Sequence, residues 1–218
     1  MFIQARIVLG HRARHVNPVI TVAGQVVPRR DGEKYVGITL SSRSPRMLSG
    51  QYPAQQSKAR TASIISFAAE SVTGSLPVET AIMLYKARVD PCLIGSADVC
   101  PDAIDSHVAL LEKEQRRHLR RILGLGRRCA TVSLFSETGL WPIRPRRALL
   151  CVDYLSYLIG RDHDSLTSAA LRDSRNLHDS GLLSWYGDAC AAAGKVGGHI
   201  PSMRLPTQEE IVFCKEQI

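Results

Sequence analysis

The spacing of apolar residues changes from strand-like to helical near residue 54. Residues 19–22 and 35–40 are short β-type runs, and residues 23–25 and 31–32 have compositions typical of turns. These runs predict a β unit of two or three strands. A unit of two or three strands is only marginally stable by itself in water. We therefore expect helices to pack on one of its faces.

Beyond the β unit, apolar residues recur at helical spacing as far as the C-terminus. The expected helices cover about 54–73, 77–90, 106–123, 131–138, 145–159, 162–173, 182–193 and 207–218. The buried face of the first helix is expected to carry Ala62, Ile65, Ala69 and Val72. Gly139 is expected to end one helix, and Thr207 with Glu210 forms a capping box for the last.

The pattern predicts an α+β fold that is mostly α, with a small antiparallel β unit followed by a helical bundle. Three parts are expected along the chain. Residues 1–50 form the β unit with a loop, residues 51–194 form a helical domain, and residues 195–218 form a linker and a C-terminal helix.

Residues 111–128 carry a dense run of positive charge. Five basic side chains recur at offsets of 0, 3, 4, 7 and 8, and on a helix they form one basic stripe: Lys113, Arg116, Arg117, Arg120 and Arg121. Arg127 and Arg128 follow the glycines that end this helix, and its inward face is expected to carry Val108, Leu111, Leu119 and Ile122. Such a stripe suits a nucleic-acid backbone contacted through its phosphates. The alternative is an ordinary solvated helix face.

Composition supports a polyanionic partner without proving one. Lys and Arg number 28 against 20 Asp and Glu, which gives a formal charge of +8. The cysteines are not spaced as zinc ligands, and neither a signal peptide nor an apolar run of membrane-spanning length is evident. We therefore expect a soluble intracellular protein, nuclear or cytoplasmic, with free thiols, no membrane partner and no small-molecule substrate.

No catalytic or metal-binding pattern stands out in the sequence. Phosphate-loop, nucleophile-elbow and HExxH patterns are missing, so no catalytic residue, metal or cofactor is predicted. His118 is expected to contact a partner or to be exposed, and Trp141 and Trp185 are expected to anchor the core. The sequence Asp162-His163-Asp164 is best explained as the start of a helix.

Four short segments follow one another between residues 34 and 144, with the sequences KYVGITL, MLYKARVDP, LEKEQRRHLRRILG and ETGLWPIR. In the same order they resemble the KYLG, LYKALVRP, LEKVQRRALRRILG and ELGLLPLR segments of reverse transcriptases from non-LTR retrotransposons. The resemblance covers about residues 19–184 and concerns the C-terminal part of that family's polymerase.

The resemblance implies that residues 1–50 correspond to the end of the palm and residues 51–194 to the thumb. In that family these regions hold the template–primer duplex, which implies RNA or an RNA–DNA duplex as partner. The family's catalytic Asp-Asp motif matches no position here, and Asp90 stands where the family has Arg. We therefore expect a non-catalytic remnant rather than an enzyme. The alternatives are a helical protein-interaction module with a basic face, or a decayed open reading frame without selected function.

Overall fold

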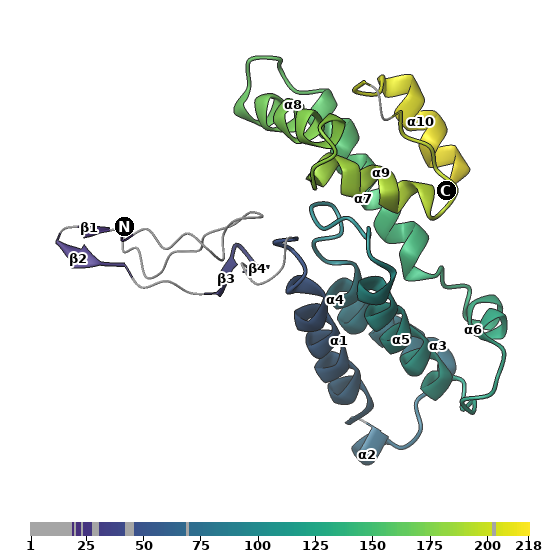
Figure 1. Ribbon diagram of the computed structural model, residues 1–218. Helices are drawn as coiled ribbons and strands as arrows, with labels where there is room; N and C mark the ends of the chain where they lie inside the picture. Colours follow the sequence, from purple (N-terminus) through teal and green to yellow (C-terminus); the bar gives the residue numbers. More distant parts are fainter. Residues whose placement is uncertain are drawn as a thin grey trace. The chain divides into compact units, whose positions relative to one another are not determined.

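The computed structural model describes Val19 and residues 21–22, 24–27, 31–41, 46–68, 70–201 and 204–218. The chain divides into two compact units, Met1–Ala54 and Gln55–Ile218. Antiparallel strands belong to the first unit and a bundle of helices makes up the second, which confirms the predicted fold class (Figure 1).

The β unit contains two separate two-stranded antiparallel sheets. β1 (Thr21–Val22) pairs with β2 (Gln25–Val26), and β3 (Gly32–Tyr35) pairs with β4 (Ile38–Ser41). All described residues of β3 and β4 are exposed or half-buried. The predicted single strand over residues 35–40 is therefore wrong, since a turn divides it.

That turn lies at Val36 and Gly37, whose φ angles are 47° and 86°. Two consecutive residues at positive φ are typical of the tightest hairpin loops, and Gly adopts this conformation without steric cost. The sequence favours Asp31–Gly32 as the turn, but Gly32 instead pairs with Ser41 inside the sheet.

The first helices of the bundle are α1 (Gln51–Ala68), α2 (Glu70–Thr73), α3 (Val78–Leu84) and α4 (Asp90–Ile94). A π-helical turn, η1 (Tyr85–Val89), joins α3 to α4. Pro91, the second residue of α4, has no backbone N–H to donate, which is the physical reason for a break in the regular hydrogen-bond ladder.

The predicted buried face of α1 is wrong. Ile65 is 57% exposed and Val72, in α2, is 87% exposed, whereas Ala59 and Phe67 are buried (Ala69 lies outside the described residues). Polar residues share the buried face, and the Gln55 side-chain amide donates to the Gly95 carbonyl. Apolar periodicity cannot reveal a face that is buried through hydrogen-bonded polar groups.

The centre of the bundle is built from α5 (Asp105–Ile122), α6 (Thr131–Thr138) and α7 (Ile143–Ile159). α5 packs against α3, α4, α6 and α7, and it buries Val108, Leu111 and Leu119 as predicted, whereas the fourth predicted residue, Ile122, is only half-buried. Gly139 ends α6 with a φ of 61°, also as predicted.

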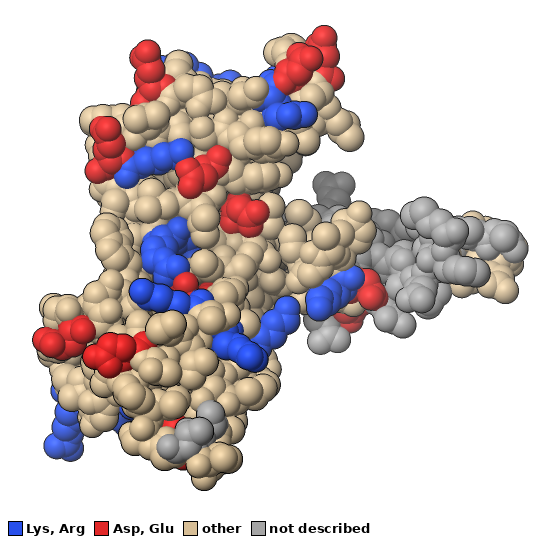
Figure 2. All heavy atoms as spheres, turned by 180° about the vertical axis from the view of Figure 1, so that it is seen from behind, with Lys and Arg blue, Asp and Glu red and all other residues tan. Residues whose placement is uncertain are grey.

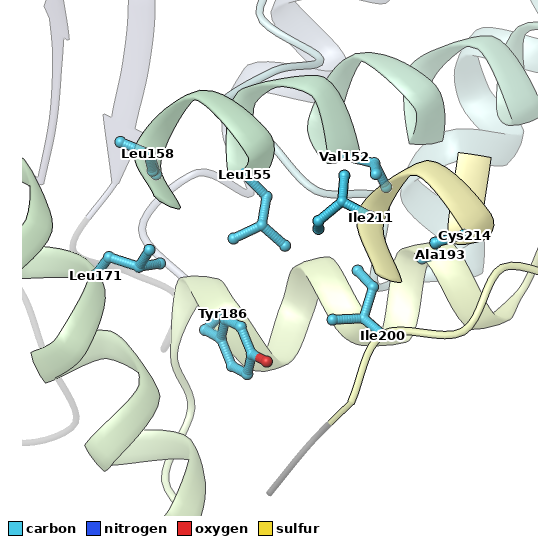
Figure 3. Packing of buried hydrophobic residues seen from close by; sticks show 9 residues of the cluster. All are labelled: Val152, Leu155, Leu158, Leu171, Tyr186, Ala193, Ile200, Ile211 and Cys214. Carbon is cyan, nitrogen blue, oxygen red and sulfur yellow. The ribbon is translucent and has the colours of Figure 1, made fainter. Parts of the chain in front are cut away.

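The last three helices, α8 (Leu166–Asp179), α9 (Trp185–Gly194) and α10 (Gln208–Gln217), pack around the C-terminal part of α7 (Figure 3). Their shared core consists of Val152, Leu155, Leu158, Leu171, Tyr186, Ala193, Ile200, Ile211 and Cys214. The capping box of Thr207 and Glu210 is present. Residues 195–218 thus lie in the same compact unit as the other helices.

Candidate nucleic-acid interface

A hollow of about 770 Å³ lies between α1 and α5, and we call it the α1–α5 groove. Side chains hold the two helices together along it: Gln56 donates to Glu114 at 3.3 Å, and the Ser63 hydroxyl lies 2.6 Å from His118 Nδ1. The groove is lined by Arg60, Ser63, Ile64, Phe67, Lys113, Glu114, Arg117, His118, Arg120, Arg121, Leu125 and Arg127. Six of these side chains are cationic and one is a carboxylate.

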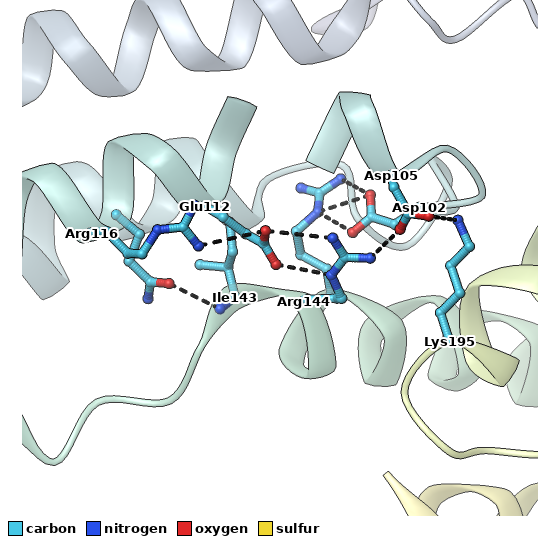
Figure 4. A network of polar contacts seen from close by, with 9 residues as sticks. Asp102, Asp105, Glu112, Arg116, Ile143, Arg144 and Lys195 are labelled. Atoms are coloured by element: carbon cyan, nitrogen blue, oxygen red, sulfur yellow. Dashed lines mark hydrogen bonds and ion pairs between the residues drawn. The ribbon is translucent and has the colours of Figure 1, made fainter. Parts of the chain in front are cut away.

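The structure divides the predicted nucleic-acid-binding residues between different surroundings. Five of them line the groove: Lys113, Arg117, Arg120, Arg121 and Arg127. Arg116 instead forms an ion pair with Glu112 at 3.7 Å, and Glu112 in turn accepts from Arg144 of α7 at 2.9 Å (Figure 4). Arg128 is exposed in the turn after α5, outside the groove lining.

Only part of the positive charge in the groove is balanced. Arg117 pairs with Glu114 at 3.7 Å, and Arg121 pairs with Glu70 of α2 at 3.4 Å. Among the described residues, Arg60, Lys113 and Arg127 form no ion pair. On the face of the helical unit shown in Figure 2, by contrast, basic and acidic side chains are interspersed. The groove therefore concentrates positive charge, whereas the face shown in Figure 2 carries both signs of charge.

His118 lies at the floor of the groove with 2% of its surface exposed, so the expectation of an exposed or partner-contacting side chain is wrong. It follows the buried Leu111 by seven residues, which places both on the inward face of α5. Burial, followed by the nearby charge of Arg121, lowers the pKa of His118 to about 4. The imidazole is therefore neutral at pH 7 and adds no charge to the groove.

Two arginines of α5 are held by specific contacts. The Arg121 guanidinium carbon lies 3.9 Å from the centre of the Phe67 ring, in a cation–π contact. A terminal nitrogen of Arg120 donates to the Cys129 carbonyl at 3.4 Å, while its Nε is buried without a partner among the described residues. Arg120 thus tethers the turn that follows α5.

Gln115 fixes α5 against the neighbouring helices. Its amide nitrogen donates to the Tyr85 hydroxyl at 3.2 Å and to the Trp141 carbonyl at 3.0 Å, and its oxygen accepts from the Ile143 N–H at 3.1 Å. Because both the nitrogen and the oxygen of this amide are hydrogen-bonded to neighbouring segments, the rotation of α5 about its own axis is fixed. The side chains that line the groove are positioned by that rotation.

Asp90 also has a structural partner. Its two carboxylate oxygens accept from Arg146 at 2.8 and 2.7 Å, and the Tyr85 hydroxyl donates to it at 3.0 Å. This contact raises the pKa of Arg146 above its usual value. The acidic residue at the position where the resembled family has Arg is therefore part of the packing between α4 and α7.

Asp102, which Figure 4 labels, forms a buried ion pair with Arg147. Arg147 is 1% exposed and donates to Asp102 at 2.8 Å and to the Leu93 carbonyl at 2.7 Å. At the surface nearby, Asp105 contacts Arg144 and, at 3.1 Å, Lys195. The basic residues that begin α7 thus fasten helices together.

The two tryptophans differ. Trp141 is 60% exposed, so its predicted role as a core anchor is wrong; its backbone carbonyl, not its indole, is held by Gln115. Trp185 is half-buried, donates from its indole nitrogen to the Val99 carbonyl at 3.0 Å and meets the Tyr154 ring edge-on at 5.7 Å. It packs as predicted.

The Asp162-His163-Asp164 sequence forms an exposed turn before α8, whose N-cap is Ser165. Within the described ranges, no three or more His, Cys, Asp or Glu residues are grouped so that they could hold a metal ion. All six cysteines are free, and three of them are buried. None of the described helices has the length and apolar character needed to cross a membrane.

No protein-family model, curated protein or solved structure matches the chain. Its function is therefore inferred from the geometry and charge of the α1–α5 groove.

Proposed function

We propose that this chain binds nucleic acid, either RNA or an RNA–DNA duplex, through phosphate contacts in the α1–α5 groove. The observation that carries the proposal is the excess of cations in that groove, with Arg60, Lys113 and Arg127 unbalanced by any carboxylate among the described residues. Closely spaced like charges repel one another, and a polyanion that follows the groove relieves this repulsion.

The length of the charged surface suits a nucleic-acid backbone. A helix rises about 1.5 Å per residue, so Lys113 and Arg121 are separated by roughly 12 Å along α5. A duplex carries one negative charge per about 1.7 Å of its axis, so several phosphates fall within that length. Contacts of this kind carry little sequence information, and binding is therefore expected to be weakly sequence-specific.

We further propose that the chain is a non-catalytic remnant of a non-LTR retrotransposon reverse transcriptase. The segment of greatest resemblance, residues 111–124, supplies the α5 wall of the groove. The catalytic Asp-Asp motif of that family matches no position of this sequence, and template-dependent nucleotide incorporation is not expected.

A second candidate function is docking of an acidic protein. Two apolar side chains of the groove favour it, because Ile64 is 60% exposed and Leu125 is 36% exposed. Interfaces between proteins bury such residues in their cores. An acidic polypeptide without nucleotide bases therefore serves as the competing ligand in the test below.

The test replaces the three groove cations that have neither an ion pair nor a tethering contact among the described residues with glutamine, in the variant Arg60→Gln, Lys113→Gln, Arg127→Gln. Fluorescence anisotropy with a labelled RNA–DNA duplex and a labelled single-stranded RNA should show affinity reduced by about tenfold or more. The matched control removes the same charge outside the groove lining, in Lys86→Gln, Arg88→Gln, Arg161→Gln, and should bind nearly as the natural protein does. Equal affinities of the two variants, or tighter binding of polyglutamate than of either nucleic acid, would contradict the proposal.

A further inference from the structure

Arg121 presents a flat cationic surface inside the groove. Its guanidinium carbon lies 3.9 Å from the centre of the Phe67 ring, and Phe67 is itself buried and packs against the His118 ring at 4.6 Å. A terminal nitrogen of the guanidinium meets Glu70 at 3.4 Å. Held by a ring beneath it and a carboxylate at one nitrogen, the guanidinium needs little further ordering to bind a ligand.

The outer side of this guanidinium is open to a ligand. The Arg121 side chain is 57% exposed, although its inner face is covered by Phe67. Ile64 lies one helical turn before Phe67 on α1 and gives the same wall of the groove an exposed apolar side chain. A planar cation beside an apolar wall fits the face and the edge of a nucleic-acid base.

We infer that the α1–α5 groove takes a single strand, with one unpaired base stacked on the guanidinium of Arg121. This inference rests on the proposed function and makes it more specific. The bases of a duplex are stacked on their neighbours, whereas an unpaired base can turn outward and lie on an arginine plane. Lys113, Arg60 and Arg127 then contact the phosphates on either side, as in other grooves that combine stacking platforms with positive charge.

The test compares two fluorescent strands that have equal length and equal numbers of phosphates. One is an oligothymidylate and the other carries abasic residues throughout. A stacked base typically changes affinity by about tenfold, so the natural protein should bind the base-bearing strand about tenfold more tightly than the abasic strand. A ratio near one in the natural protein would overturn the inference.

The variant Arg121→Lys keeps the positive charge and removes the planar guanidinium group. It should bring the ratio of the two affinities close to one, with the affinity for the abasic strand changed by less than about twofold. The matched control is Arg161→Lys, because Arg161 also lies over an aromatic ring, 5.5 Å from the centre of Tyr157, but outside the groove lining. The control should retain the tenfold ratio, and circular dichroism verifies that each variant is folded.

Failure of the inference is distinguishable from failure of the proposed function. If both strands bind equally and binding weakens steeply with salt, the groove contacts phosphates alone and the inference is wrong. If Arg121→Lys leaves the ratio of the two affinities unchanged, the base does not stack on Arg121, and the inference is likewise wrong. If neither strand binds, and single-stranded RNA and the RNA–DNA duplex do not bind either, both the inference and the proposed function are wrong.

Discussion

At the scale of single residues, the basic side chains include one group that fastens helices together and another that lines the α1–α5 groove. Arg144, Arg146 and Arg147, near the start of α7, contact Glu112, Asp90 and Asp102 respectively. These partners lie 32, 56 and 45 residues away along the chain. Local sequence cannot separate the two groups, because a structural arginine and a binding arginine differ only in their distant partners.

The buried pair of Arg147 and Asp102 gives a prediction for stability. In Asp102→Asn the buried Arg147 guanidinium loses the negative charge of Asp102, which should lower the free energy of unfolding by about 3 kcal/mol. Urea denaturation measures the change. Asp153→Asn makes the same substitution in the ion pair with Lys215, where Asp153 is 57% exposed, and should cost less than about 1 kcal/mol. Equal effects in the two variants would contradict a structural role for Arg147.

His118 gives a prediction for pH dependence. Its folded-state pKa of about 4 lies below the ordinary value of 6.5, so the unfolded chain takes up the proton first as the pH falls. The contribution of His118 to stability is complete above about pH 6.5 and is lost progressively toward pH 4. An NMR titration of the imidazole should give a midpoint near 4, and the stability of His118→Asn should fall less over this range. A midpoint near 6.5 would show that the side chain is not buried.

At the scale of elements, local signals predict some helix ends well and strand boundaries poorly. The helix expected at 162–173 is α8, which runs instead from Leu166 to Asp179. Gly139 and the Thr207–Glu210 capping box act within one turn of the chain, so their sequences determine where helices end or begin. The β-type run at residues 35–40 gives no sign of the hairpin turn, because Val36 adopts a positive φ, which a β-branched residue rarely does. Similarly, the buried face of α1 depends on Gln55 and its distant partner Gly95, and no local pattern encodes that contact.

The β3–β4 hairpin gives a prediction about local stability in the intact protein. It has four residues in each strand and none of them is buried, so little apolar surface stabilises its hydrogen bonds. Hydrogen exchange measured by mass spectrometry should show its amides exchanging at least about a hundredfold faster than those around Leu155 in α7, which is fully buried. Equal protection of the two segments would mean that contacts outside its own two strands stabilise the hairpin.

At the scale of the whole molecule, the groove exists because α1 packs beside α5. Sequence spacing correctly places Lys113, Arg117 and Arg121 on one face, since a single helix determines that arrangement. It misses Arg60, which lies on another helix and has no distinguishing local pattern. It also includes Arg116, whose side chain turns to Glu112. The site therefore combines a predictable helix face with a second wall that only tertiary packing supplies.

The salt dependence of binding reports directly on the phosphate contacts proposed for the α1–α5 groove. For a single-stranded or duplex ligand, the slope of log affinity against log salt concentration changes by about 0.7 to 0.9 for each phosphate that a cation no longer neutralises. If Arg60, Lys113 and Arg127 each contact a phosphate, their replacement by glutamine should reduce the slope by about 2 to 3, while the control Lys86→Gln, Arg88→Gln, Arg161→Gln leaves it unchanged. An unchanged slope in the groove variant, with its helical circular dichroism intact, would contradict phosphate binding and make the groove an ordinary solvated surface.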